Sequence, residues 1–332
     1  MNNRNRALDW LKLVMAMAVV GIHTEPFIDA YAPLYYVLTQ GIFRLAVPVF
    51  LMATGFYFSR MMENPGEMRS WVRRLLLLYA IWMVVYGMKY LPRNTHPATF
   101  LQFGLTLLLG YWHLWYLVAA CLGGAMLYAL RSRSDESLAS VAAVLFFGGV
   151  CMQYLVAWFD LKNPVASPAF DHQVLCRNFL FLGFPFLTAG YLISRNTWIA
   201  RARISTVAGW LLVGLFSMCF ESLENYGRYG IRQPFETLVS LPLPAVSLFA
   251  LMQKICIARG PGFIGPLSTA IYLSHPLAIL LLLRIGVQHG AMQFLYTLIL
   301  TVAISPVLLC LARAFPELLG NRSVTSRRWQ PS

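Results

Sequence analysis

The sequence predicts an all-α integral membrane protein with about ten transmembrane helices and both termini in the cytoplasm. Hydrophobic residues make up 58% of its 332 residues and charged residues only 12%, whereas soluble domains carry about 25% charged residues. Apolar stretches long enough to cross a bilayer recur about ten times along the chain. Lysines and arginines concentrate in every second loop between these stretches, which is typical of a multi-pass membrane protein.

The predicted spans follow one another along the whole chain. They cover 8–24, 35–58, 72–91, 105–130, 138–158, 177–194, 205–221, 236–254, 266–285 and 292–313. The seventh is short, and the second and fourth are long enough to tilt or to include a turn at the interface. We expect them to form a single transmembrane domain over 1–332, with no appended soluble domain and no internal repeat.

The distribution of positive charge predicts the orientation. With ten spans, the termini share one side of the membrane with the loops 59–71, 131–137, 195–204 and 255–265. That side holds seventeen of the 26 lysines and arginines, and the other side holds seven. Because positively charged loops stay in the cytoplasm, we expect a multi-pass protein of the cytoplasmic (inner) membrane. Topology thereby explains the net charge of +13, so the expected partner is the lipid bilayer and not a nucleic acid.

Neither a cleaved signal peptide nor a metal site is predicted. Arg4 and Arg6 precede an apolar run, but Asp9 and Lys12 interrupt that run and no small-residue cleavage site follows. We therefore expect a retained first helix. The six cysteines are scattered among the spans without metal-ligand spacing, which favours packing roles and no metal.

The first span, 7–25, carries three ionisable side chains within an apolar run. Lys12 and His23 are eleven residues apart, so on a helix they share one face at a separation of about 16 Å. Asp9 lies one turn before Lys12, close to the same face. Ionisable groups inside a membrane segment are costly and mark a functional pathway. Alternatively, the side chains of Asp9 and Lys12 lie near the cytoplasmic end of the span and extend to the water interface, which needs no functional role. His23 lies deeper in the span, so this explanation does not apply to it.

The ionisable side chains in and near the spans fall into two layers. The cytoplasmic layer comprises Asp9, Lys12, Arg73 and Arg74. Its positive charge suits the phosphates of an anionic donor. The outer layer comprises His23, Arg44, His113, Arg177, Glu221 and Glu224. Histidines and carboxylates are the groups that take a proton from a hydroxyl at neutral pH.

Several of these positions also have a simpler structural explanation. Topology alone places positive residues such as Arg73 and Arg74 on the cytoplasmic side. The aromatic residues around His113 are equally typical of an interfacial belt. Glu224 fits a solvated loop residue, whereas Glu221 directly follows apolar residues and fits a buried, paired group.

Several motifs in the right order resemble acyltransferase family 3, a family of multi-span membrane proteins, over nearly the whole chain. The first helix of that family carries a basic residue, ten intervening residues and a histidine, which here are Lys12 and His23. The segment FLMATGF, with Gly55, is similar to the family's second-helix signature of Phe followed by Ser-Gly-Phe. HLWYL and IYLSHP resemble its signatures in the fourth helix and near the C-terminus, and the latter places His275 before Pro276 in mid-membrane.

The segments RLAVPVF, HLWYL, RNFLF and FES are most similar to one branch of that family. This branch holds polysaccharide O-acetyltransferases and the membrane domain of vancomycin-resistance serine racemases. Family members often carry two arginines spaced RxxR at the third helix, whereas this chain has adjacent Arg73 and Arg74 with Arg69 before them. The departure leaves the contacts to the donor phosphates open.

The resemblance implies an O-acyltransferase that moves an acetyl or longer acyl group from cytoplasmic acetyl-CoA to a hydroxyl of a cell-envelope glycan or lipid-linked sugar. It implies that His23 is a general base or a transient acyl carrier. The residues implied in catalysis are His23, Lys12, Arg44 and Glu221. The residues implied in holding the acetyl-CoA donor are Asp9, Arg73 and Arg74. The residues implied in binding the acceptor are His113, Trp115, Arg177, Tyr272 and His275.

A different class of function fits the same residue types. Buried histidine, arginine and glutamate also serve ion-coupled transport, so the alternative is a transporter or sensor for a small polar solute such as an amino acid. Transporters often show inverted repeats or paired broken helices, and neither is visible in the sequence. An assembly subunit of an envelope pathway is a third alternative. The acceptor and the oligomeric state stay undetermined.

Overall fold

The computed structural model describes residues 6–92, 96–159, 176–231, 233–255, 257 and 261–319, and every regular element in these residues is helical. Eight helical stretches are long and apolar enough to cross a membrane. The predicted all-α architecture with several membrane-crossing helices is confirmed for these residues, whereas the number ten and the sides of the termini stay predictions.

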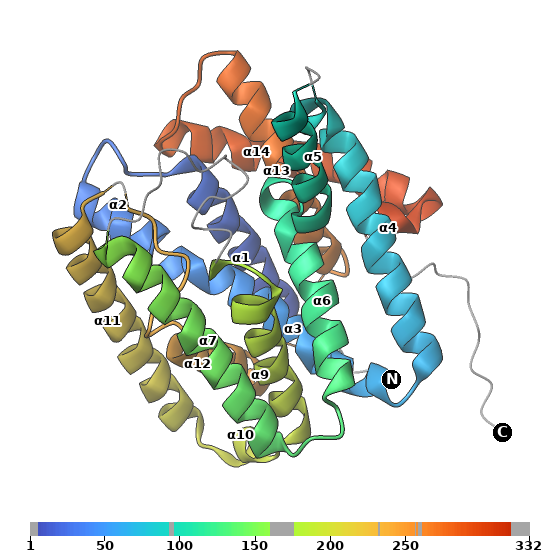
Figure 1. Cartoon of the computed structure of the whole chain (residues 1–332), viewed down its shortest axis with the longest axis vertical. Helices are drawn as coiled ribbons and strands as arrows, with labels where there is room; N and C mark the ends of the chain where they lie inside the picture. The colour runs from blue at the N-terminus through green and yellow to red at the C-terminus, as the bar shows by residue number, and fades with distance from the viewer. Residues whose placement is uncertain are drawn as a thin grey trace.

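The long helices are α1 (Ala7–Thr24), α3 (Ala46–Met62), α4 (Pro65–Tyr90), α6 (Trp115–Ala129), α7 (Asp135–Trp158), α11 (Ile204–Tyr229), α13 (Ile264–Arg284) and α14 (Ala291–Ala314). The shorter elements are α2 (Ala32–Thr39), η1 (Ile42–Leu45), α5 (Pro97–Leu109), η2 (Trp112–Leu114), η4 (Phe179–Gly183), α9 (Phe184–Arg195), α10 (Trp198–Arg201), α12 (Pro242–Lys254) and η5 (Pro316–Leu319). In Figure 1, α4, α6, α7 and α11 run along the length of the bundle and α3 crosses it obliquely.

The predicted span 105–130, which is long enough to include a turn at the interface, is interrupted near its start. α5 ends at Leu109, and the next residue, Gly110, adopts a φ of 91°. A Cβ at this position would also crowd the backbone of Leu114 and Trp115. Glycine accepts both conditions at low cost, so α5 and α6 are separate helices joined through η2.

Three other helix boundaries differ from the predicted spans. α4 begins at Pro65 rather than at 72, because Asn64 caps its first turn with a side-chain oxygen. α11, predicted as a short span, runs for 26 residues. The eighth predicted span begins too early, because the chain over 233–241 is a loop and α12 starts at Pro242.

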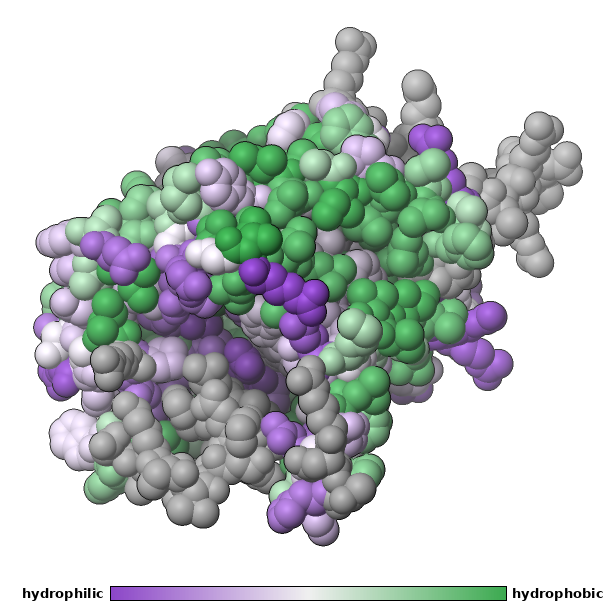
Figure 2. All heavy atoms as spheres, turned by 90° about the horizontal axis from the view of Figure 1, so that it is seen from above, coloured by the Kyte–Doolittle hydropathy of each residue, from purple (hydrophilic) through white to green (hydrophobic). Residues whose placement is uncertain are grey.

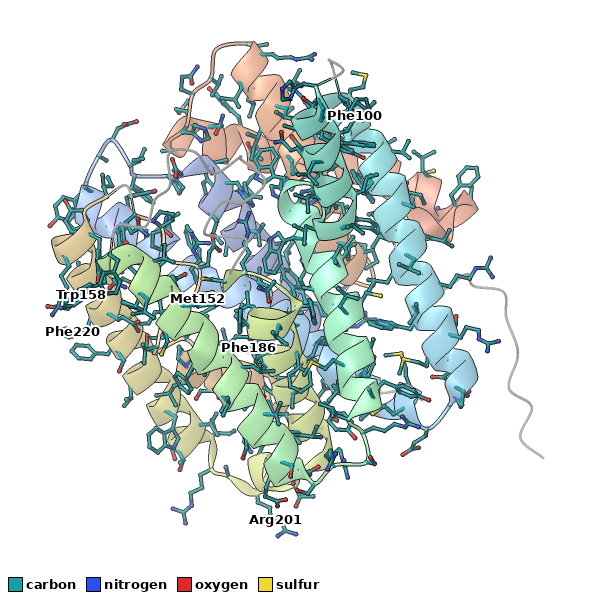
Figure 3. All side chains as sticks on the ribbon, in the orientation of Figure 1. Phe100, Met152, Trp158, Phe186, Arg201 and Phe220 are labelled. Atoms are coloured by element: carbon teal, nitrogen blue, oxygen red, sulfur yellow. The ribbon has the colours of Figure 1, made fainter. Side chains whose placement is uncertain are left out.

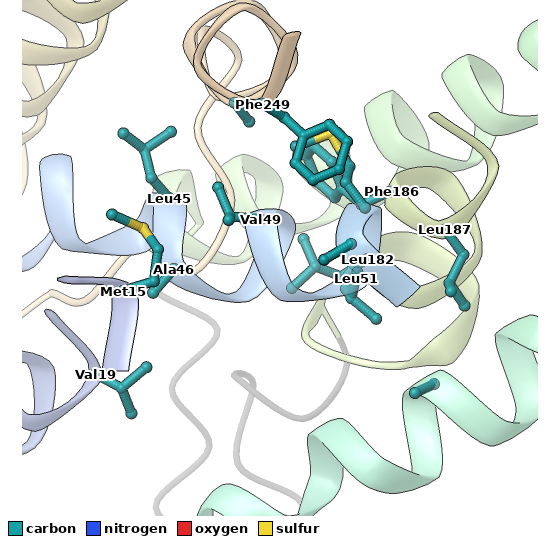
Figure 4. Close-up of a cluster of buried hydrophobic side chains, with 14 of the residues drawn as sticks. Met15, Val19, Leu45, Ala46, Val49, Leu51, Leu182, Phe186, Leu187 and Phe249 are labelled. Carbon is teal, nitrogen blue, oxygen red and sulfur yellow. The ribbon is translucent and has the colours of Figure 1, made fainter. Parts of the chain in front are cut away.

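α3 lies in the interior of the bundle and packs against α1, α9 and α12 (Figure 4). The side chains labelled in this contact region are Met15, Val19, Leu45, Ala46, Val49, Leu51, Leu182, Phe186, Leu187 and Phe249. Glycines let α3 and α9 cross closely. A Cβ at Gly55 would overlap the carbonyl of Leu187, and one at Gly190 would overlap the carbonyl of Met52. Small residues at such crossings are typical of membrane helix bundles.

The flank of the bundle is apolar. Trp158 at the end of α7 and Phe220 on α11 project outward (Figure 3) and are 70% and 59% exposed. Large exposed apolar side chains recur along these helices and suit contact with lipid. Arg201, by contrast, lies at the lower end of the molecule in Figure 3.

The upper end of the bundle in Figure 1 carries α2, α5 and the C-terminal end of α1. Seen from above, this face is hollowed, with hydrophilic residues around the hollow and hydrophobic residues on the flank (Figure 2). The last turn of α1 contains His23, so the deepest ionisable residue of the first span belongs to the polar end of the molecule.

Candidate functional site

Three histidines from distant parts of the chain lie side by side near the end of α1. His23 is in the last turn of α1, His113 is in η2 and His275 is in α13. The ring centroids of His23 and His275 are 5.3 Å apart with nearly parallel planes, and those of His113 and His275 are 5.0 Å apart at a steep angle. The structure therefore brings three predicted site residues into one group, which we call the histidine cluster.

A tryptophan holds His23 from the side of η2. The indole Nε1–H of Trp112 donates a hydrogen bond to Nδ1 of His23 over 3.1 Å. Trp112 adopts a φ of 49°, in the left-handed region that bulky side chains rarely occupy. Such strain persists only where the surrounding structure enforces it, and it concentrates at functional sites. The arrangement of η2 thus favours a role for Trp112 in orienting His23.

A proline in α13 determines how His275 is held. Pro276 has no backbone N–H, so it cannot bond the carbonyl of Tyr272 four residues earlier. Nδ1 of His275 lies 2.6 Å from that carbonyl. The hydroxyl of Tyr272 donates to the backbone carbonyl of His113 over 2.6 Å. Tyr272, a predicted acceptor-binding residue, thereby fixes the positions of two histidines.

The histidine cluster is buried and incompletely hydrogen-bonded. His275 and His113 are 0% and 2% exposed, and His23 is half-buried. Among the residues that the structure describes, neither ring nitrogen of His113 nor Nε2 of His275 has a hydrogen-bond partner. A buried polar atom without a partner costs about 1–3 kcal/mol and is rare in folded proteins. Three such atoms in one group are available to a polar ligand group or to water.

Arg44, Arg177 and Trp115 belong to a second polar group, which we call the arginine cluster. The Arg44 guanidinium donates to Glu236, and Arg177 lies 3.5 Å from the other carboxylate oxygen of Glu236. The Arg177 guanidinium is also 5.8 Å from the centroid of the Trp115 ring. Arg44 and Arg177 are electrostatic neighbours of His23. Four predicted residues of the outer layer are thus divided between two neighbouring clusters: His23 and His113 in one, Arg44 and Arg177 in the other.

Glu236 joins the two arginines and was missed by the sequence analysis. Its backbone N–H and that of Thr237 donate to Oε1 of Gln153 on α7, over 2.7 and 3.2 Å. Arg44 also donates to the side chain of Gln40, so its charge has two partners. A signal was available, because Glu236 is the only acidic residue in the predicted span 236–254.

Glu221 bonds to a loop in this structure. Its carboxylate accepts from the hydroxyl of Tyr154 over 2.6 Å and from the backbone N–H of Val239 over 2.7 Å. It also accepts from the N–H and the hydroxyl of Ser240 over 2.8 and 2.6 Å. These bonds tie the loop to α7 and α11 and favour an anchoring role. Glu224 is paired with Arg228 at the surface, as expected for a solvated residue.

The predicted donor-binding residues of α1 lie in its first half. Asp9 is buried, and its carboxylate is 3.4 Å from the guanidinium of Arg6. The ammonium of Lys12 lies 5.7 Å from the ring centroid of Tyr57 on α3. Lys12 and His23 therefore lie on one unbroken helix, near opposite ends of it.

The predicted arginines of α4 lie along the first half of that helix. Arg73 is exposed and lines a groove on the surface of α4 together with Arg69, whereas Arg74 is half-buried. The groove is lined by residues of α4.

A cysteine lies close to the arginine cluster, and its thiol is protonated at neutral pH. Burial, together with the negative charge of Glu236, raises the pKa of the Cys176 thiol to about 12, so this cysteine stays protonated at neutral pH. Within the described residues, no group of three or more histidine, cysteine, aspartate or glutamate side chains is arranged to hold a metal ion.

The geometry agrees with a comparison against known families, in which an acyltransferase domain model matches residues 5–310. The chain belongs to acyltransferase family 3. A serine/alanine racemase of Enterococcus gallinarum is 27% identical over 326 residues, which cover 90% of this chain and 45% of the racemase. An amino-acid racemase of Enterococcus faecalis is 24% identical over 339 residues, which cover 94% of this chain and 47% of the racemase.

Both relatives are longer than this acyltransferase-3 protein, which spans less than half of the length of each. No solved structure matches the chain. The resemblance predicted from the motifs is thus confirmed at the level of the family, and the reaction is addressed below.

Two aromatic residues complete the histidine cluster and were not predicted. Trp112 bonds to His23, and the ring of Tyr86 on α4 lies edge-on to His113 at 5.4 Å. The Tyr86 hydroxyl donates to the carbonyl of Leu273 over 2.7 Å. Trp112 could have been suspected because it stands next to His113, whereas nothing distinguishes Tyr86 from the other tyrosines in the sequence.

Proposed function

We propose that this acyltransferase-3 protein transfers an acetyl or similar acyl group from cytoplasmic acetyl-CoA to a hydroxyl of a cell-envelope glycan or lipid-linked sugar. The observation that carries the proposal is the histidine cluster near the C-terminal end of α1. The N-terminal half of the same helix carries Lys12. α1 is continuous over Ala7–Thr24, so Lys12 and His23 are about 16 Å apart along its axis. A pantetheine arm bridges such a distance, which allows the nucleotide to stay at the cytoplasmic end.

The residues of the outer end supply the groups that acyl transfer needs. A hydroxyl acceptor requires a proton acceptor, and the carbonyl oxygen of the thioester requires a hydrogen-bond donor or a positive charge. Neutral histidines provide both kinds of nitrogen. The adjoining Arg44 and Arg177 add positive charge near His23. In this proposal the acceptor contacts the histidine cluster and the Trp115 side of the arginine cluster.

The cytoplasmic end supplies positive charge for the donor. Lys12, Arg73 and Arg74 would bind the phosphates of acetyl-CoA, with Asp9 orienting the basic groups. Arg69 and Arg73 are one helical turn apart and line the same groove. This pair therefore takes the place of the RxxR arrangement that the family often shows.

The proposal is tested by removing one side chain from each end of the route. His23→Ala and Lys12→Ala are each expected to abolish the incorporation of radioactive acetyl groups from acetyl-CoA into the envelope glycan fraction, with unchanged insertion into membranes. The matched controls are His96→Ala and Lys89→Ala, because both residues are exposed. Normal acetylation by His23→Ala would exclude this function for the cluster.

The alternative function is a transporter or sensor for a small polar solute such as serine, an amino acid that the name of one relative contains. Buried histidine, arginine and glutamate occur in such proteins as well. Mass spectrometry of surface glycans with and without the gene separates the two functions. Loss of acetyl-sized mass increments supports acyl transfer, whereas unchanged glycans with altered serine uptake support transport.

A further inference from the structure

The hydrogen bond from Trp112 determines which ring nitrogen of His23 carries the proton. An indole N–H can only donate, so Nδ1 of His23, at 3.1 Å from it, is the unprotonated nitrogen. In a neutral imidazole the proton then lies on Nε2. His23 therefore presents a hydrogen-bond donor at the free end of its ring.

His275 has the opposite arrangement. A carbonyl oxygen can only accept, so Nδ1 of His275, at 2.6 Å from the Tyr272 carbonyl, carries the proton. Pro276 makes this possible because its missing N–H leaves that carbonyl available to the side chain. Neutral His275 thus presents an unprotonated Nε2. This nitrogen is buried and has no partner among the described residues.

We propose that these two stacked histidines divide the steps of acyl transfer between them. Nε2 of His275 accepts the proton of the acceptor hydroxyl, and the Nε2–H of His23 donates to the carbonyl oxygen of the acyl group. The proposal rests on the acyl-transfer function proposed above and assigns the general base to α13 instead of α1. Trp112 and Tyr272 are positioning residues, because each fixes the proton on one histidine through a hydrogen bond.

The distance between the rings suits this division. Their centroids are 5.3 Å apart and their planes are nearly parallel. One tetrahedral carbon with its two oxygens is small enough to contact both rings from the same side. His23 is half-buried and His275 is buried, so the acceptor passes His23 before it meets the base. The carbonyl donor therefore lies on the more accessible side of the pair.

The transfer step balances without a further reactant. The acceptor oxygen forms a bond to the thioester carbon while its proton moves to Nε2 of His275. The negative charge that develops on the carbonyl oxygen is stabilised by the N–H of His23. The carbon–sulfur bond then breaks, and the leaving thiolate takes the proton from His275. The products are an O-acyl ester and free CoA, and both histidines regain their initial protonation.

Amide side chains distinguish the two roles. His275→Asn keeps a donor for the Tyr272 carbonyl but has no basic nitrogen, so acetyl transfer from acetyl-CoA to the envelope glycan fraction should fall at least about 100-fold. His23→Gln keeps an acceptor for Trp112 and a donor near the Nε2 position. The rate of acetyl transfer should fall about tenfold or less in His23→Gln and far more in His23→Ala. His96→Asn and His96→Gln are the matched controls at an exposed histidine.

Nitrogen-15 NMR of the full chain with labelled histidines in detergent tests the protonation pattern without an activity assay. The expected spectrum has one ring protonated only on Nε2, which disappears in His23→Gln, and one protonated only on Nδ1, which disappears in His275→Asn. Trp112→Phe removes the donor to His23 and should shift the first signal alone. The chain has six histidines, so the variants assign the signals; Trp112→Phe keeps every histidine and still assigns the His23 signal where His23→Gln folds poorly.

The proposal is overturned if His275→Asn keeps more than about a tenth of the wild-type rate. It is also overturned if His23→Gln is as inactive as His23→Ala, or if His23 carries its proton on Nδ1. Failure of the underlying function looks different. A wild-type protein that transfers no acetyl group refutes the proposed function, whereas an active wild type with an active His275→Asn variant refutes only the division between the two histidines.

Discussion

The histidine cluster and the Glu221 anchor are both polar groups inside an apolar bundle, but they differ in how completely they are hydrogen-bonded. Glu221 accepts four hydrogen bonds, from Tyr154, Val239 and Ser240. In the histidine cluster, three ring nitrogens have no partner within the described part of the chain. A fully paired group holds one conformation, whereas an unpaired buried group is costly unless a ligand completes it. The difference separates residues that hold the fold from residues that are available for chemistry.

The arginine cluster is intermediate between these two regions. Its charges are paired, yet two guanidinium groups, those of Arg44 and Arg177, share the single carboxylate of Glu236. Within the described residues, the positive charge of these two groups thus exceeds the negative charge of the carboxylate that they share. This cluster combines a structural ion pair with a local field that suits developing negative charge.

The largest expected loss of stability follows from breaking the arginine cluster. Glu236→Ala leaves Arg44 buried without its carboxylate, and removing one partner of a buried ion pair costs about 3–5 kcal/mol. Thermal unfolding of the purified protein in detergent should show a clearly lower midpoint. Acetyl transfer should fall together with the fraction of folded protein.

The matched control for this variant is Glu224→Ala. Glu224 and Arg228 form an exposed pair one helical turn apart, at 3.2 Å. Exposed pairs of this kind contribute about 0.3–0.5 kcal/mol. Equal losses of stability in Glu236→Ala and Glu224→Ala would contradict the buried role of the arginine cluster.

A smaller loss is expected at the Glu221 anchor. Glu221→Ala removes the acceptor for its four hydrogen bonds, at a cost of about 2–3 kcal/mol, because water can reach some of the freed donors. The measurement is the unfolding midpoint together with the acetyl-transfer rate per folded molecule. An anchoring role predicts a lower midpoint and a rate within about threefold of the wild type. An unchanged midpoint with a lost rate would show that Glu221 takes part in catalysis.

The features that could be predicted from the sequence are those visible one segment at a time. Apolar length identified most of the helices, and an ionisable residue within an apolar run identified His23, His113 and His275 without knowledge of their neighbours. The family resemblance rested on short local motifs of the same kind. The length of the span 105–130 allowed a turn, but the position of that turn at Gly110 was not predicted, because the aromatic residues after it keep the stretch apolar.

The partners of these residues could not be predicted, because pairing is a tertiary property. Arg44 and Glu236 are 192 residues apart in the chain, and nothing local indicates that they meet. Trp112 reaches His23 from a left-handed backbone conformation, which no local sequence pattern predicts. Hydropathy thus locates the buried polar residues, and the fold decides which are paired and which are left for a ligand.

The smallest expected effect on stability lies in the histidine cluster itself. His113→Phe replaces a ring whose two nitrogens have no partner with an apolar ring that keeps the edge-on contacts to Tyr86 and Tyr272. Removing an unpaired buried polar group is close to neutral, so the free energy of unfolding should change by less than about 1 kcal/mol in either direction. Acetyl transfer should nevertheless fall, because the ligand loses a polar contact. A variant that is both stable and fully active would show that His113 is a packing residue, and the unpaired nitrogens would then mark a ligand site only at His275.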